Sequence, residues 1–282
     1  MGFESGMFPG LPPAEVEDQS NKENPKKTAP PESDERDLDV RTTRITEDIV
    51  RQMREIEVRP EDRDSEGNLL VSPGGPVSEL NEVEWRFVRT EAFEEWFSDS
   101  LITNQNGEPL VVYHGSPITF DEFDHRRSQK AKRDTGFFGS GNYFSPNREL
   151  AAKYGPNMYR CFLRVKKLQM FTVENGNVRF TERPLPTNIH DTVWSRYEKR
   201  RQQRLEEIGS SEADVDKNSP QGWGYVAPDT SQNFEDILSD AVAEVLVEQG
   251  YGGAIGYNPI SKLDEYVVFD GEDVLIIPPE EK

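Results

Sequence analysis

The sequence predicts an α+β domain preceded by a disordered N-terminal arm. Short apolar strands alternate with helices of varied length, and several of the strands are joined by hairpin-like turns. The first 80 residues differ in kind, because they are rich in proline and charge and hold no tryptophan or tyrosine. We therefore expect an arm over residues 1–80 and a folded domain over residues 85–282.

The arm carries a net charge of −9 and nine of the prolines of the chain. Such a segment buries too little apolar surface to offset the entropy lost on ordering. Within it, apolar side chains recur at helical spacing between Ile45 and Val58. This pattern predicts a short helix over residues 45–58, which either docks on another surface or forms transiently within a linker.

The whole chain is a polyanion. Its 282 residues include 33 Lys and Arg against 53 Asp and Glu, for a net charge of −20, and only 34% are hydrophobic. Nucleic-acid binding needs clustered basic side chains that replace counterions on phosphates, so the overall field disfavours it. No run of about 20 apolar residues could span a bilayer, and the start Met1–Glu4 lacks the basic, apolar character of a secretory signal. The single cysteine, Cys161, fits a reducing compartment.

The first half of the folded domain predicts two helices and two strands around glycine-rich turns. Thr90 can cap a helix with one apolar face, and Pro146 can occupy the first position of another. An Asn-Gly turn over residues 104–107 precedes a buried strand whose end carries His114. In chain order, the expected elements are a helix at 90–101, strands at 109–113 and 159–165, and a helix at 146–154.

The second half predicts an inserted segment and a C-terminal helix with three strands. Residues 182–232 break the pattern with prolines, a basic helical stretch at 196–208 and a polar loop. The helix at 234–249 is amphipathic and is closed by Gly250. Short strands then follow at 254–257, 265–269 and 274–277.

One segment reverses the sign of the charge. Residues 126–170 hold eleven basic residues against two acidic ones, a net of +9. A solvated face is one interpretation of such a run. The other is a site for an anionic ligand such as a pyrophosphate.

Three spots combine reactive side chains with unusual backbone. His114 precedes a glycine that would let a ligand approach the backbone closely. Two glycines, Gly139 and Gly141, precede Tyr143, and Tyr154 follows, so that two aromatic faces could stack on a flat ring. Glu265 opens an apolar strand and can face the side opposite to Tyr266.

In their order and residue patterns, these three segments resemble the motifs of the His-Tyr-Glu class of ADP-ribosyltransferases, which includes poly(ADP-ribose) polymerases and diphtheria toxin. The resemblance is strongest to the small transferase modules of phage and bacterial polyvalent, toxin-like proteins. It spans about residues 110–277 and implies a split, mostly antiparallel β-sheet core with flanking helices. Three segments carry it: His114-Gly115-Ser116, Gly139-Ser140-Gly141-Asn142-Tyr143-Phe144 with Tyr154, and Glu265-Tyr266-Val267-Val268-Phe269-Asp270.

The resemblance implies NAD+ as the substrate, no metal, and a role for each matched residue. His114 would bind a ribose hydroxyl, and the backbone of Gly115 would bind the nicotinamide carboxamide. Tyr143 and Tyr154 would sandwich the nicotinamide ring. Glu265 would bind the ribose 2′-hydroxyl and stabilise the positive charge that develops as nicotinamide leaves. The expected catalytic residues are Glu265, His114 and Tyr143, and the expected NAD+-binding residues are His114, Gly115, Ser116, Gly141, Tyr143, Phe144 and Tyr154.

Two positions depart from related patterns. The family often has a serine three residues before the second tyrosine, where this chain has Ala151; Ser145 is a candidate substitute. Leu263 stands two residues before Glu265, so the Glu-x-Glu of the arginine-modifying toxins is missing.

The resemblance favours a mono-ADP-ribosyltransferase that modifies a protein, as a phage or bacterial effector acting in a bacterial cytoplasm or delivered into a host cell. Water as the acceptor would make the protein an NAD+ glycohydrolase. A catalytically inactive NAD+-binding or virion interaction module is the alternative outside enzymes. Nucleic acid as the acceptor is a further possibility through the basic segment.

Overall fold

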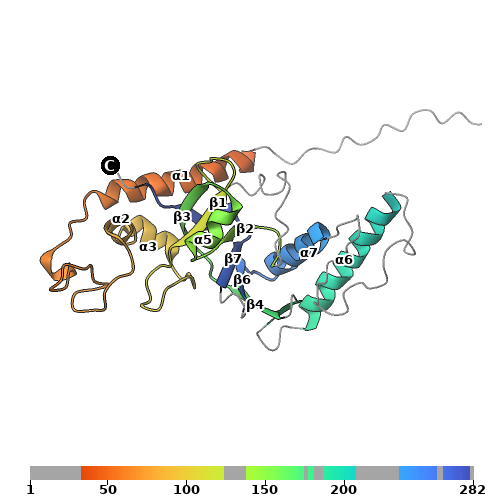
Figure 1. The fold of residues 1–282 in the computed structure, drawn as a ribbon. Helices are drawn as coiled ribbons and strands as arrows, with labels where there is room; N and C mark the ends of the chain where they lie inside the picture. The colour runs from red at the N-terminus through yellow and green to blue at the C-terminus, as the bar shows by residue number, and fades with distance from the viewer. Residues whose placement is uncertain are drawn as a thin grey trace, which may run out of the picture.

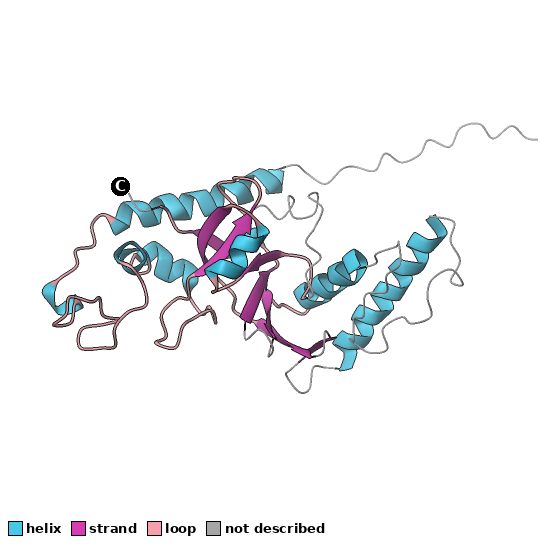
Figure 2. Cartoon of the chain, viewed as in Figure 1, coloured by secondary structure: helices cyan, strands magenta, loops and turns pink. Residues whose placement is uncertain are grey.

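The computed structural model describes residues 33–123, 138–174, 177–180, 187–207, 235–258 and 263–279 (Figures 1 and 2). Two sheets form its centre, one of three strands in the order β1-β3-β8 and one of five in the order β2-β7-β6-β4-β5. The sheets join where β1 meets the end of β2, through a bridge between Tyr113 and Ser145. The strands are β1 (Val112–Ser116), β2 (Asn142–Phe144), β3 (Asn157–Leu163), β4 (Leu168–Glu174), β5 (Asn177–Phe180), β6 (Gly253–Asn258), β7 (Leu263–Val268) and β8 (Val274–Ile276).

The split, mostly antiparallel core is as expected. Among the strand pairs, β4 and β6 run parallel and the others antiparallel. The alternation of side chains sorts residues between two faces. In β3, Cys161 and Leu163 point into the core between the sheets, whereas Phe162 points to the outer face. Burial raises the pKa of the Cys161 thiol well above its usual value, which keeps it protonated.

Helices near the N-terminus cover the outer face of the three-stranded sheet (Figure 1). They are α1 (Ser33–Met53), α2 (Glu82–Phe87) and α3 (Glu91–Phe97), with a 3-10 turn, η1 (Pro60–Asp62), between the first two. Asn81 caps α2 in a capping box with Glu84, and the Thr90 hydroxyl accepts from the Phe93 N–H at the start of α3, as expected. Ile49 of α1 is fully buried among Phe87, Phe93 and Phe162.

The prediction of a disordered arm is therefore wrong for residues 33–80. The helix expected at 45–58 exists, but it begins at Ser33, ends at Met53 and packs on the sheet. Residues 59–80 form turns in which Leu69 and Leu80 are buried, and the Trp85 indole N–H donates to the carbonyl of Leu70. The apolar side chains of this region find their partners later in the chain, so local composition does not reveal them. Residues 1–32 lie outside the described part, where the arm stays a prediction.

Two helices, α6 (Thr187–Glu207) and α7 (Glu235–Glu248), lie on the other side of the molecule, against the five-stranded sheet (Figure 1). Ile189, Val193 and Tyr197 of α6 belong to the same buried cluster as Val245 of α7 and Val267 of β7. The described part of the expected insertion at 182–232 is thus helical and contributes to the core, and residues 182–186 and 208–232 lie outside the described part. Gly250, with φ +81°, ends α7 as predicted.

Other differences concern the ends of elements. The strand expected at 109–113 is β1, which begins at Val112 and continues through His114 to Ser116, so His114 lies within the strand. The helix expected at 146–154 consists of α5 (Arg148–Ala151) and a 3-10 turn, η2 (Ala152–Tyr154); a further 3-10 turn, η4 (Gly271–Asp273), precedes β8.

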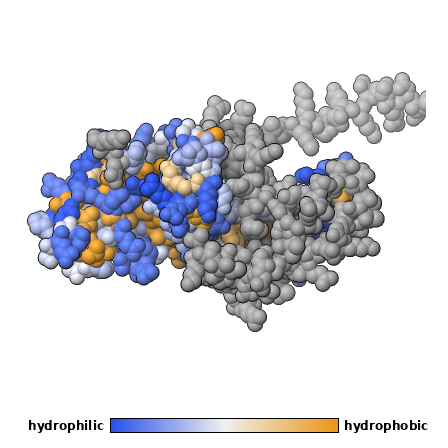
Figure 3. Space-filling model, in the orientation of Figure 1, coloured by the Kyte–Doolittle hydropathy of each residue, from blue (hydrophilic) through white to orange (hydrophobic). Residues whose placement is uncertain are grey.

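Hydrophobic residues are visible between hydrophilic ones on the surface over the N-terminal part (Figure 3). The large exposed ones include Val77, Leu101 and Ile118, and scattered exposure of this kind is ordinary. Across the described ranges, no helix is long and apolar enough to cross a membrane.

Candidate active site

A small cavity of about 40 Å³ opens where β1 and β2 meet. Its walls come from five elements, β1, β2, α5, η2 and β7, together with the residue after β2. Six of the eight predicted site residues lie in it, and Ser116 and Gly141 do not. The lining residues are Tyr113, His114, Gly115, Tyr143, Phe144, Ser145, Ala151, Tyr154 and Glu265.

His114 is held in one orientation by β2. Its Nδ1 lies 2.8 Å from the carbonyl oxygen of Tyr143. Because a carbonyl only accepts, Nδ1 carries a proton, which leaves Nε2 as the acceptor whenever the ring is neutral. The ring also packs edge-on against Phe123, at 5.0 Å between centroids, and near Phe144. The ring of His114 is therefore held in place with Nδ1 toward the backbone of Tyr143.

Tyr143 is fixed at both ends. Its backbone carbonyl holds His114, and its hydroxyl donates to the carbonyl oxygen of Gly139 at 2.7 Å and accepts from the N–H of Phe138 at 3.1 Å. Phe138 in turn fills the space beside Gly256, where a Cβ would lie 1.8 Å from the phenyl ring. Phe138 and Gly256 could not be singled out from the sequence, where their only signal is the aromatic and glycine content of their segments.

Glu265 meets a tyrosine hydroxyl. The Tyr154 Oη donates to Glu265 Oε1 at 3.2 Å, and Tyr154 is 48% exposed. Burial raises the pKa of Glu265, and the hydrogen bond from Tyr154 opposes that rise in part. Burial also raises the pKa of the neighbouring Asp264. A desolvated carboxylate in a cleft is the kind of group that stabilises a nearby positive charge strongly, because little water screens it.

Comparison with known proteins agrees with this geometry. The model of the family described as "ADP-Ribosyltransferase in polyvalent proteins" matches residues 104–275, more than half of the chain. The chain belongs to this family. Every residue of the cavity lies within the matched segment.

Two further comparisons add little. No curated protein matches the chain at a significant level. A solved structure described as the crystal structure of an anti-CRISPR protein aligns with 59% of this chain and 94% of its own, at 17% identity and a TM-score of 0.27.

The predicted glycines and small residues of the site make close packing contacts. A Cβ on Gly115 would lie 2.0 Å from the carbonyl oxygen of Ala151, so only glycine lets α5 approach β1 this closely. A Cβ on Gly141 would lie 2.6 Å from Val267. The Ser116 side chain is buried, and its hydroxyl accepts from the N–H of Ile118.

The structure also shows the surroundings of Ala151, which replaces the serine of the family pattern, and of Ser145, its candidate substitute. Ala151 is buried against β1. Ser145, the candidate substitute for the missing serine, does line the cavity, but its hydroxyl donates to the carbonyl of Asp264 at 3.1 Å and accepts from the N–H of Asn147. The Ser145 hydroxyl therefore stabilises the turn between β2 and α5.

The interpretation of the basic segment as a site for an anionic ligand is wrong for three of its residues, because their side chains form ion pairs with acidic residues on other elements. Arg148 and Lys153 differ from these three, since they are exposed on α5 and η2, beside the cavity. Arg126 to Arg133 lie outside the described part. The pairs are Arg160 with Glu84 at 2.6 Å, Arg164 with Asp273 at 2.7 Å and Lys166 with Asp99 at 3.6 Å.

Proposed function

We propose that this protein is a mono-ADP-ribosyltransferase that cleaves the nicotinamide–ribose bond of NAD+ and transfers ADP-ribose to a protein, as a phage or bacterial effector. One observation carries the proposal. His114, Tyr143, Tyr154 and Glu265, which are separated by up to 151 positions in the sequence, line one cavity. Membership of an ADP-ribosyltransferase family supports NAD+ as the substrate.

The contacts of the cavity fit the parts of NAD+. The Nε2 of His114 suits a ribose hydroxyl that donates a hydrogen bond. The rings of Tyr143 and Tyr154 suit the two faces of a nicotinamide ring. Displacement of the exposed Tyr154 hydroxyl from Glu265 would free the carboxylate for the ribose 2′-hydroxyl.

Glu265 supplies the electrostatic part of the reaction. As the bond between C1′ and the nicotinamide nitrogen breaks, its electron pair leaves with the ring, and positive charge develops on the ribose. A fixed carboxylate beside the ribose stabilises that charge more than it stabilises the substrate, which lowers the barrier. The nucleophile of the acceptor then bonds to C1′ and loses its proton.

The identity of the acceptor separates this proposal from its alternatives. Incubation with NAD+ labelled in its adenylate phosphate and with a bacterial lysate should give labelled material that is sensitive to protease. Label that only nuclease removes would make nucleic acid the acceptor. Free labelled ADP-ribose without transfer would make the protein a glycohydrolase, and intact NAD+ would make it an inactive binding module.

Tyr154→Ala tests the site in the same assay. The variant loses one stacking face for nicotinamide, so the KM for NAD+ should rise at least several-fold. Leu101→Ala, which also removes an exposed side chain but lies outside the cavity, is the matched control. Equal kinetics in the two variants would contradict the assignment of Tyr154.

A further inference from the structure

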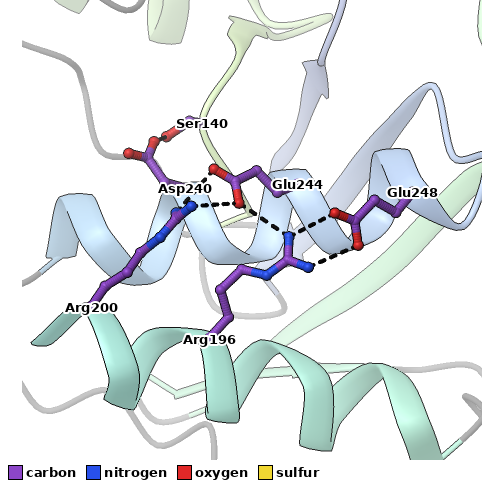
Figure 4. A network of polar contacts seen from close by, with 6 residues as sticks. All are labelled: Ser140, Arg196, Arg200, Asp240, Glu244 and Glu248. Atoms are coloured by element: carbon purple, nitrogen blue, oxygen red, sulfur yellow. Dashed lines mark hydrogen bonds and ion pairs between the residues drawn. The ribbon is translucent and has the colours of Figure 1, made fainter. Parts of the chain in front are cut away.

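A polar network on α7 reaches the loop that precedes the cavity (Figure 4). Ser140 lies between the two glycines of this loop, and its hydroxyl donates to Asp240 Oδ1 at 2.5 Å. The same hydroxyl lies 3.3 Å from the Ser239 hydroxyl, and the Ser140 N–H donates to the Ser239 carbonyl at 3.0 Å. One residue of the loop is thus tied to α7 through both its backbone and its side chain.

The neighbouring Gly139 makes the second contact between this loop and α7. Its φ of +113° is a conformation that favours glycine. A Cβ there would lie 3.2 Å from the backbone nitrogen of Ala243, so the loop lies directly against α7. The carbonyl of Gly139 is also the group that accepts from the Tyr143 hydroxyl at 2.7 Å. The attachment of the loop to α7 therefore determines where that hydroxyl is held.

We propose that Asp240 is a positioning residue for Tyr143, acting through Ser140 and the carbonyl of Gly139. The inference rests on the proposed function, in which Tyr143 stacks on nicotinamide. Asp240 fixes Ser140, Ser140 fixes the carbonyl of Gly139, and that carbonyl fixes the phenol ring. The backbone of Tyr143 then orients His114. A hydrogen bond to an ionised carboxylate is stronger than one between neutral groups, so an aspartate suits this task.

Two arginines of α6 form ion pairs with α7 at positions beyond Asp240, and these pairs provide a control. Arg196 pairs with Glu244 at 3.1 Å and Glu248 at 2.8 Å, and Arg200 pairs with Glu244 at 2.9 Å (Figure 4). Glu248 is 56% exposed in its side chain and lies two turns beyond Asp240. Its removal affects the packing of α6 on α7 without touching the loop.

The first test compares Asp240→Ala, Asp240→Asn, Ser140→Ala and Glu248→Ala in the full chain, by NAD+ cleavage and thermal unfolding. We expect Asp240→Ala and Ser140→Ala to lower kcat about tenfold in folded protein, since a misplaced aromatic face costs transition-state binding. Asp240→Asn should recover part of that loss, because an amide oxygen still accepts from Ser140. Glu248→Ala should keep the kcat of the wild type. Equal losses in Asp240→Ala and Glu248→Ala, or an unchanged kcat in Asp240→Ala, would overturn the proposal.

The second test does not depend on turnover, so it separates failure of this inference from failure of the proposed function. The chain has nine tyrosines. Labelling them with 3-fluorotyrosine gives a fluorine resonance for Tyr143 that its absence in Tyr143→Phe identifies. We expect this resonance to move or broaden in Asp240→Ala and to stay in place in Glu248→Ala. A resonance that is unchanged in Asp240→Ala would overturn the inference even if NAD+ were cleaved.

Discussion

Carboxylates have different partners in the two regions of the molecule. In the layer near the N-terminus, Glu84 of α2 meets the guanidinium of Arg160 on β3. At the cavity, Glu265 meets the hydroxyl of Tyr154, and burial raises its pKa. A carboxylate that is paired with a guanidinium holds two layers together. A desolvated carboxylate beside a neutral hydroxyl is not neutralised by that partner, so it can stabilise positive charge on a ligand. The first arrangement serves the fold and the second serves the proposed chemistry.

The largest expected effect tests whether α1 belongs to the fold. Ile49→Ala removes a fully buried side chain from the cluster around Phe93 and Phe162. The free energy of unfolding should fall by about 3 to 4 kcal/mol. Denaturant titration measures the change, and Glu47→Ala, on an exposed position of the same helix, is the control. If both variants unfold like the wild type, α1 is not docked.

Breaking the ion pair between Arg160 and Glu84 should lower the free energy of unfolding somewhat less. Arg160→Ala leaves Glu84 buried without its guanidinium, at a cost of about 3 kcal/mol. Cleavage of NAD+ per folded molecule should stay close to that of the wild type. The exposed pair of Arg51 with Asp48 is the control, and Arg51→Ala should leave stability nearly unchanged. Loss of activity in folded Arg160→Ala protein would remove the distinction between the two regions.

Tyr154→Phe should shift the pH dependence of cleavage. The hydrogen bond from Tyr154 favours the ionised form of Glu265 and lowers its pKa, so its loss raises that pKa further. In the proposed mechanism cleavage needs the carboxylate, so activity should fall as the pH drops through the pKa of Glu265. The acid limb of kcat/KM, which reports the pKa of Glu265 in the free enzyme, should therefore move to higher pH in the variant. An acid limb at the same pH in both proteins would show that this bond does not tune Glu265.

The smallest effect concerns stability. Burial raises the pKa of folded Glu265, so the protonated form contributes stability at low pH that is lost as the pH rises through the raised value. Glu265→Gln carries no such cost. The variant should be slightly more stable than the wild type at neutral pH, with the difference vanishing below the usual pKa of glutamate. Thermal unfolding at both pH values measures this, and a destabilised variant at neutral pH would contradict it.

Much of the candidate site could be predicted from the sequence because its residues stand in short, ordered motifs. His114, Tyr143 and Glu265 each lie on a strand whose apolar neighbours reveal it. Asp240 and Phe138 could not be predicted in this way. Their roles come from contacts across about 100 positions in one case and from the space left by a distant glycine in the other.

The fold was less accessible near the N-terminus. Residues 33–80 look unfavourable for folding when they are considered alone, because their prolines and charges outnumber their apolar side chains. The partners of Ile49 and Leu80 are aromatic residues after position 84, and periodicity within a segment carries no information about them. The ion pairs of Arg160 and Arg164 could not be predicted for the same reason, since their partners Glu84 and Asp273 lie on other elements.

The central claim is that the Glu265 carboxylate stabilises the transition state of NAD+ cleavage. Its most direct test is the rate of nicotinamide release at saturating NAD+ by wild type and by Glu265→Gln, with Glu149→Gln as an exposed control on α5. We expect Glu265→Gln to be slower by about 100-fold or more while it remains folded, and Glu149→Gln to match the wild type. Release of nicotinamide at the wild-type rate by folded Glu265→Gln would contradict the account.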